Sequence, residues 1–279
     1  MKRWPQAILI GVAVVFFSLR AIGGRNAAHE AQMPPNRAIA GSSVTADMPT
    51  LAADFTEAPL DESEPLPDLK INAALVKDAT GSRIFYRLNA NERWPLASLT
   101  KLMTATIAIE NLPATRERDD FIRRMMVVSD NSAADGLADM TGIEQWIGLM
   151  NAKAERLGMN DTGFSDASGL SYLNQSTAGD ISKLVSYILQ RHPEIFAYSR
   201  AKSAKIGGTV LANINEFVNR PDFLGGKTGF TDEANGNLVT LFSTAQGTVV
   251  AIVLGTPDKT ERFIQTERLF AWLSRRFRL

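Results

Sequence analysis

Three short polar motifs contain residue types that could together activate a nucleophile. Ser98 and Lys101 form a Ser-x-x-Lys motif, Ser129 begins a Ser-Asp-Asn motif, and Lys227 begins a Lys-Thr-Gly motif. A spacing of three puts Ser98 and Lys101 on one face of a helix, where a neutral lysine amine can take the hydroxyl proton. Each motif alone also has an ordinary structural explanation, namely a helix cap with a solvated lysine, a turn, or a surface lysine on an edge strand. We interpret the first pair as a serine nucleophile with a lysine base.

Composition narrows the choice of nucleophile and base. The 279-residue chain has no cysteine, which excludes thiol nucleophiles, disulfide bonds and thiolate zinc sites. Its only histidines, His29 and His192, lie in a polar stretch and directly before a proline, and both are expected to be surface residues. Thirty basic residues balance thirty acidic ones, so no net field favours nucleic acid as a partner. We therefore expect no metal, no cofactor and no histidine base.

The elements that must position these motifs follow from hydrophobic periodicity. Five β-prone runs are expected to form strands: residues 71–78, 83–88, 225–231, 238–243 and 249–254. Helices are expected over residues 96–110, over most of 118–190 outside a loop at 158–176, and over 258–277. Strands at both ends with helices between them predict an α/β (α+β) fold, with an antiparallel sheet flanked by helices, a helical lobe and a cleft between the two.

The N-terminal quarter of the chain differs from the rest. Lys2 and Arg3 precede the apolar run Ala7–Phe17, so residues 1–24 are expected to be an export signal, either cleaved or kept as a membrane anchor. Residues 25–68 are rich in proline and acidic residues and are expected to form a disordered tether. Residues 69–279 are expected to be the catalytic domain, with a sheet lobe at about 69–112 and 205–279 and a helical lobe at about 113–204.

The three motifs, in this order, resemble the signature set of penicillin-binding proteins and serine β-lactamases. The similarity extends to four further segments: 73–81, 95–104, 149–159 and 165–170, and beyond Lys-Thr-Gly to residue 234. Over residues 69–279 the chain resembles the D-alanyl-D-alanine carboxypeptidase family, the low-molecular-mass penicillin-binding proteins. The resemblance implies a penicillin-binding-protein or β-lactamase-like fold.

The resemblance also implies a role for each motif residue. Ser98 attacks the carbonyl of the penultimate D-alanine, and Lys101 is its general base. Ser129 bridges the two lysines and helps to return a proton to the leaving amine. Asn131 holds the acyl-side amide of the substrate and contacts Lys101.

The third motif is implied to bind the other end of the substrate. Lys227 and Thr228 bind the terminal carboxylate, and Lys227 helps to keep Lys101 neutral. Gly229 lets the substrate backbone lie against the strand. The oxyanion is expected between the backbone N–H groups of Ser98 and Phe230.

The expected function is that of a serine D,D-carboxypeptidase that trims peptidoglycan stem peptides in the periplasm or at the outer face of the cytoplasmic membrane. β-Lactams are then expected to be covalent inhibitors. A D,D-endopeptidase that cuts cross-links uses the same residues and remains an alternative, as does a catalytically impaired penicillin-binding or peptidoglycan-binding protein. One departure from the family is a shortened stretch between Lys101 and Ser129, in which residues 111–124 are expected to form a loop and a short helix.

Overall fold

The computed structural model describes residues 65–206, 208–277 and 279 of the chain. The export signal expected at residues 1–24 and most of the tether expected at 25–68 lie outside the described residues. Within the described ranges, no helix combines the length and the apolar character needed to cross a membrane.

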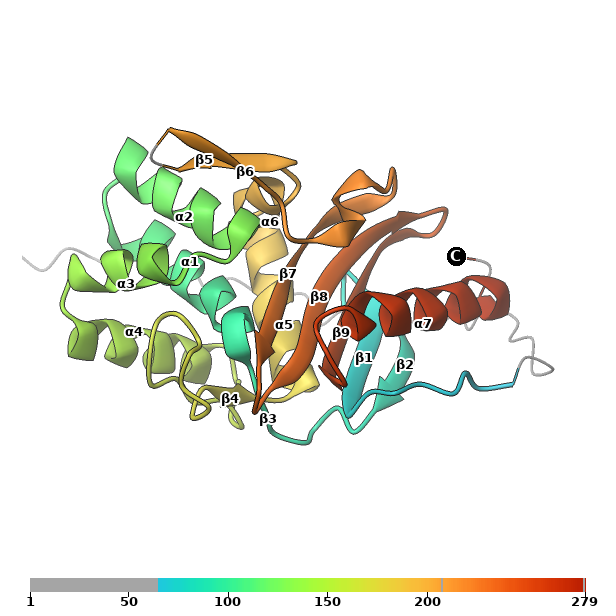
Figure 1. Cartoon of the computed structure of the whole chain (residues 1–279). Helices are drawn as coiled ribbons and strands as arrows, with labels where there is room; N and C mark the ends of the chain where they lie inside the picture. The colour runs from blue at the N-terminus through green and yellow to red at the C-terminus, as the bar shows by residue number, and fades with distance from the viewer. Residues whose placement is uncertain (1–64, 207, 278) are drawn as a thin grey trace, which may run out of the picture. The chain divides into compact units, whose positions relative to one another are not determined.

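A five-stranded antiparallel sheet forms the framework of the described structure (Figure 1). Its order is β2-β1-β9-β8-β7, so strands from opposite ends of the chain pair in the middle of the sheet. The bounds are β1 Ala73–Asp78, β2 Ile84–Leu88, β7 Phe223–Thr231, β8 Asn235–Thr244 and β9 Gly247–Thr256. All five expected strands are present. β8 and β9 extend past the apolar runs that predicted them, because backbone pairing continues into their polar ends, and β7 begins two residues earlier than expected, at Phe223.

The sheet is covered on both faces, which explains the long apolar run in β9. Residues 249–254 of β9 are all buried and alternate between two hydrophobic clusters. One cluster lies on the face covered by α5 (Ala178–Arg191), and the other lies under α7 (Glu261–Phe277). Figure 1 shows α5 and α7 on opposite faces of the sheet. Each fully buried valine or leucine stabilises the fold by about 1.5–3 kcal/mol, so this sandwich holds the sheet rigid. The expected combination of antiparallel sheet, flanking helices and helical lobe is confirmed.

The remaining helices form the helical side of the molecule. They are α1 Thr100–Asn111, α2 Arg116–Val128, α3 Asn131–Asp139, α4 Ile143–Arg156 and α6 Glu194–Ser199. As expected, a loop at residues 112–115 precedes a helix in the shortened stretch, but this helix, α2, is 13 residues long and continues through the apolar run at residues 125–128. Thr115 caps its first turn by accepting from the N–H of Arg118, and its buried side chains pack in the same cluster as α1. The shortened stretch therefore folds as a short loop and a helix that leads directly to Ser129.

Two short strands belong with the helices rather than with the large sheet. β5 (Ser203–Ile206) and β6 (Thr209–Ala212) pair only with each other and contact α2. The expected lobe boundary at about residue 205 falls inside this hairpin. In the large sheet, β1 and β2 come before the helices in the chain, and the other three strands begin at Phe223 with β7. A separate short pairing of β3 (Trp94–Pro95) with β4 (Gln175–Ser176) ties the start of the nucleophile region to the loop before α5.

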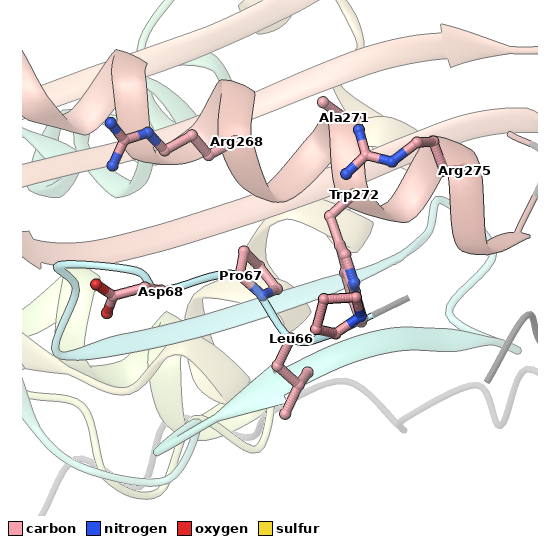
Figure 2. A pocket seen from close by; sticks show the side chains of 8 residues that line it. Leu66, Pro67, Asp68, Arg268, Ala271, Trp272 and Arg275 are labelled. Carbon is pink, nitrogen blue, oxygen red and sulfur yellow. The ribbon is translucent and has the colours of Figure 1, made fainter. Parts of the chain in front are cut away.

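The first described residues run along α7. Leu66, Pro67 and Asp68 lie across from Arg268 and Trp272 and form a surface depression with them (Figure 2). None of the predicted site residues lines this depression.

Candidate active site

Ser98 lies in a tight turn held by close backbone packing. It belongs to a 3₁₀ turn, η1 (Ala97–Leu99), directly before α1, so it begins the helical segment as expected. Ala97 has φ +47°, a conformation that costs a non-glycine residue free energy and that recurs at functional sites. Asn237 of β8 donates to the carbonyls of Pro95 (2.8 Å) and Leu96 (3.2 Å), which anchors this turn to the sheet.

Lys101 lies one helical turn from Ser98 and is fully buried. Its Nζ is 3.0 Å from Ser98 Oγ and 2.7 Å from Asn131 Oδ1, and it also donates to the carbonyl of Ser168. Burial lowers the pKa of Lys101 to about 8, although the carboxylates of Asp135, Asp166 and Asp130 partly oppose this shift. A large fraction of Lys101 is therefore neutral at mildly alkaline pH.

The partners of Lys101 determine where the lone pair of its neutral amine points. A neutral amine has two N–H donors and one lone pair, and the oxygens of Asn131 Oδ1 and the Ser168 carbonyl can only accept. These two oxygens use both N–H groups. The lone pair is left facing the hydroxyl of Ser98, which can donate to it. This geometry suits proton abstraction from Ser98.

The Ser-Asp-Asn motif joins two helices at the site. Ser129 ends α2 in a left-handed conformation (φ 59°), Asp130 caps α3 by accepting from Ala133 N, and Asn131 is the first residue of α3. The motif is thus a helix junction, as its ordinary structural explanation predicts, and it also directs two side chains at lysines. Ser129 Oγ accepts from Lys227 Nζ at 2.8 Å, whereas Asn131 contacts Lys101.

The Lys-Thr-Gly motif lies in β7, at the edge of the sheet and next to η1. Lys227 is 1% exposed and donates to Ser129 Oγ and to the Thr228 carbonyl (2.7 Å), so it is not a surface lysine. A Cβ atom at Gly229 would lie 2.8 Å from the Leu96 carbonyl oxygen. The glycine therefore allows β7 to approach the nucleophile turn. Phe230, which follows it, is 40% exposed.

Two buried cations, Lys227 and Arg262, lie close to each other at this edge. Burial and the positive charges of Lys101 and Arg262 hold the pKa of Lys227 well below its usual range. Arg262 of α7 is also buried; it donates to the Gly229 carbonyl at 2.9 Å, and burial lowers its pKa to about 10. Over the described part of the chain, no carboxylate forms an ion pair with Lys227 or Arg262. An anionic ligand would supply the missing negative charge.

The structure brings the three motifs together and adds residues that the motifs do not contain. The main additions are the Ser168 carbonyl, which accepts from Lys101, and the guanidinium of Arg262. Segment 165–170 is one of the segments that resemble the family, and this similarity is the one indication in the sequence that points to the Ser168 carbonyl. Arg262 lies in an amphipathic helix, and nothing in its local sequence separates it from the other arginines there.

Comparison with known proteins agrees with this arrangement. The family of D-alanyl-D-alanine carboxypeptidases, peptidase family S11, matches residues 114–258. A D-alanyl-D-alanine endopeptidase of Haemophilus influenzae is 33% identical over 201 residues, which cover 59% of this chain and 68% of that protein. A D-alanyl-D-alanine carboxypeptidase of Escherichia coli, DacC, is 27% identical over 74% of this chain and 62% of its own length.

A solved structure supports the same assignment. Penicillin-binding protein D2 of Listeria monocytogenes, in its cefotaxime-bound form, is 28% identical with a TM-score of 0.68, covering 75% of this chain and 99% of that one. The resemblance drawn from the motifs is confirmed. The chain belongs to the D-alanyl-D-alanine carboxypeptidase family of serine peptidases, S11.

Proposed function

We propose that the protein is a serine D,D-carboxypeptidase that removes the terminal D-alanine from peptidoglycan stem peptides through an acyl-enzyme on Ser98. The observation that carries this proposal is the contact between a half-buried serine and a buried lysine of lowered pKa, 3.0 Å apart. The two oxygens that take the lysine N–H groups leave its lone pair for the serine proton. Family membership supplies the substrate class.

The proposed reaction has two steps. Lys101 takes the proton of Ser98 as Oγ attacks the carbonyl of the penultimate D-alanine. The C–N bond to the terminal D-alanine then breaks, and the proton passes to the leaving amine by way of Ser129. Water next attacks the ester carbonyl, with Lys101 taking a proton from it and returning it to Ser98 Oγ. The backbone N–H groups of Ser98 and Phe230 are the proposed oxyanion donors, supported by the close approach of β7 to η1.

Substrate binding is proposed to use both ends of the site. Lys227 and Thr228 bind the terminal carboxylate, and the positive charge of Arg262 strengthens this binding. Neither cation forms an ion pair within the described ranges, which supports an anionic ligand here. Asn131 is proposed to hold the acyl-side amide through its Nδ2 group, while its oxygen remains on Lys101.

A D,D-endopeptidase that cuts peptidoglycan cross-links is the second candidate. The relative from Haemophilus influenzae, at 33% identity, is an endopeptidase, and the chain spans about two thirds of it. The chemistry at Ser98 is the same in both, since a cross-link also presents a D-alanyl-D-amino-acid bond. The two differ in the size of the leaving group that the cleft admits.

The protein is inferred to act outside the cytoplasm, where peptidoglycan lies, and to be acylated by β-lactams, as the solved relative with bound cefotaxime suggests. Attachment to the membrane through the apolar segment at residues 7–17 is a further part of the proposal.

Two measurements test the proposal. A fluorescent penicillin should label the purified protein covalently at Ser98, and Ser98→Ala should abolish labelling. Incubation with purified muropeptides, followed by mass spectrometry, then separates the candidates. Loss of one D-alanine from a pentapeptide indicates a carboxypeptidase, and conversion of dimers to monomers indicates an endopeptidase. Labelling without turnover of either substrate would instead mean a binding protein, and no labelling would refute the acyl-enzyme.

A further inference from the structure

The loop at residues 165–174 carries the Ser168 carbonyl that accepts from Lys101, and a dense hydrogen-bond network holds it. The carboxylate of Asp166 accepts from the backbone N–H groups of Ser168 (2.9 Å), Gly169 and Ser171 (2.6 Å). It also accepts from Asn174 Nδ2 at 3.0 Å. One carboxylate therefore fixes the backbone on both sides of the Ser168 carbonyl.

Asn174 ties this loop to the helix that carries Lys101. Its side chain is completely buried; Oδ1 accepts from the N–H groups of Ser165 (2.6 Å) and Asp166 (3.2 Å), and Nδ2 donates to Thr100 Oγ1 at 3.1 Å. A second link is the hydroxyl of Thr104, which donates to the Ala167 carbonyl at 2.6 Å. The loop is thus bonded to α1 at both ends of the turn that contains Lys101.

The loop also packs directly on the nucleophile turn. Gly169 has φ +86°, and a Cβ atom there would lie 1.9 Å from the Ala97 carbonyl oxygen. No other residue type fits this contact. The loop, the turn of Ser98 and the first turn of α1 therefore form one rigid unit, and a shift of the loop would move the Ser168 oxygen relative to Lys101.

We propose that Asp166 and Asn174 are positioning residues, which hold the Ser168 carbonyl where it takes one N–H of Lys101 and so direct the lone pair of Lys101 at Ser98. In the described structure, the side chains of these two residues form no hydrogen bond with Ser98 or Lys101, so both act through the Ser168 carbonyl. This inference rests on the proposed function, because it concerns the base of that reaction.

Asp166 can affect acylation in two ways: its negative charge acts on Lys101, and its hydrogen bonds fix the position of the Ser168 carbonyl. The test measures both effects. Four charged groups influence Lys101: Asp166 in the loop, Asp130 and Asp135 at α3, and Lys227 on β7. Asp135 also accepts from the Ser168 hydroxyl, but it does not bond the loop backbone. Removing either carboxylate disfavours the ammonium form, so both Asp166→Asn and Asp135→Asn should move the rise of acylation rate to lower pH.

The experiment measures the rate of acylation by a fluorescent penicillin between pH 5.5 and 10, per labelled site. Asp166→Asn should lower the alkaline plateau by about tenfold or more, since small misplacements of reacting groups are costly. Asp135→Asn also removes one carboxylate near Lys101. This variant should shift the rise of the acylation rate to lower pH without lowering the alkaline plateau. Thr104→Val, which removes one bond to the loop and no charge, should lower the plateau without shifting the rise.

The outcomes are distinct. A plateau for Asp166→Asn that equals that of Asp135→Asn, together with a wild-type plateau for Thr104→Val, would overturn the positioning role. If Asp166→Asn does not fold, Thr104→Val decides, because valine has nearly the same shape as threonine. Failure of the wild-type protein to label at all would instead refute the proposed function, and the positioning role with it.

Discussion

Two buried lysines supply the candidate site, and their surroundings are opposite in kind. Lys101, on α1, is surrounded by oxygens that accept from it and by carboxylates that raise its pKa against the effect of burial. Lys227, on β7, has a hydroxyl and a carbonyl as hydrogen-bond partners and a second cation, Arg262, nearby. Burial lowers both pKa values, but the neighbouring charges oppose this shift at Lys101 and reinforce it at Lys227.

The difference indicates what each lysine can do. The oxygens of Asn131 and Ser168 take the two N–H groups of neutral Lys101. Its lone pair is therefore left to accept the Ser98 proton. Lys227 has no carboxylate partner among the described residues, so it gains most from an anion that arrives with a ligand. The helical side of the molecule therefore provides the base, and the edge of the sheet provides the anion receptor.

Removing the base or the nucleophile should have the largest effect. Lys101→Ala and Ser98→Ala should each lower penicillin acylation by about 10³-fold or more, because the two residues act as a unit. Lys77→Ala is a suitable control: Lys77 is also buried and has a pKa lowered by burial, but its Nζ contacts Ser186 of α5 and none of the motif residues. Acylation of Lys101→Ala at the rate of this control would remove Lys101 as the base.

Burial of Lys101 should reduce the stability of the protein. Lowering its pKa from 10.5 to about 8 corresponds to about 3 kcal/mol at 1.36 kcal/mol per pKa unit, so Lys101→Met should raise the free energy of unfolding at pH 7 by up to that amount. Between pH 8 and 10.5 the unfolded chain binds more protons than the native one, so wild-type stability should rise with pH there. This rise should shrink in Lys101→Met.

Lys153→Met provides the contrast for that measurement. Lys153 is buried too, but its Nζ pairs with Glu110 at 2.6 Å and contacts Tyr187. Removing it leaves a partly buried carboxylate without its cation, so this variant should be destabilised. Denaturant unfolding of both variants at pH 7 and pH 10 checks the pair. Destabilisation of Lys101→Met at pH 7 would contradict the assigned cost of burying Lys101.

Loss of the anion receptor should have a smaller effect that depends on the ligand. Lys227→Ala should slow acylation by a penicillin free acid by about 10²-fold, but should affect the methyl ester less, because only the acid carries the carboxylate. Loss of this positive charge should also raise the pKa of Lys101, and the rate should then rise at higher pH. Lys227→Arg should keep part of the preference for the acid. Equal losses for acid and ester would mean that Lys227 does not bind the carboxylate.

The smallest expected effect concerns Arg262. Arg262→Gln should reduce acylation by the free acid about fivefold, since a nearby cation is removed while Lys227 remains. Arg268→Gln, an exposed arginine on the same helix, is the matched control and should leave the rate unchanged. If both variants behave alike, the net charge of α7 matters rather than the position of Arg262.

Much of the fold and half of the site followed from local sequence patterns. The strands and α7 were predicted because apolar periodicity reports burial directly, and Ser98 with Lys101 because three residues along a helix always share a face. The length of α2 was underestimated because its first turns are charged, and its stability comes from packing against α1 rather than from its own pattern.

The sequence by itself determined the residue types, their order and the spacing within each motif, which sufficed to assign the family and the nucleophile. Only the tertiary structure decided which groups meet across long separations. It brought the Ser168 carbonyl to Lys101 and Arg262 to β7, whereas the contact of Ser129 with Lys227, 98 residues away, was already implied by the resemblance. The physical reason is that a backbone carbonyl is present at every residue and an arginine recurs along α7. Residue type therefore cannot mark these groups, and only the packing of the loop and helix gives them their positions.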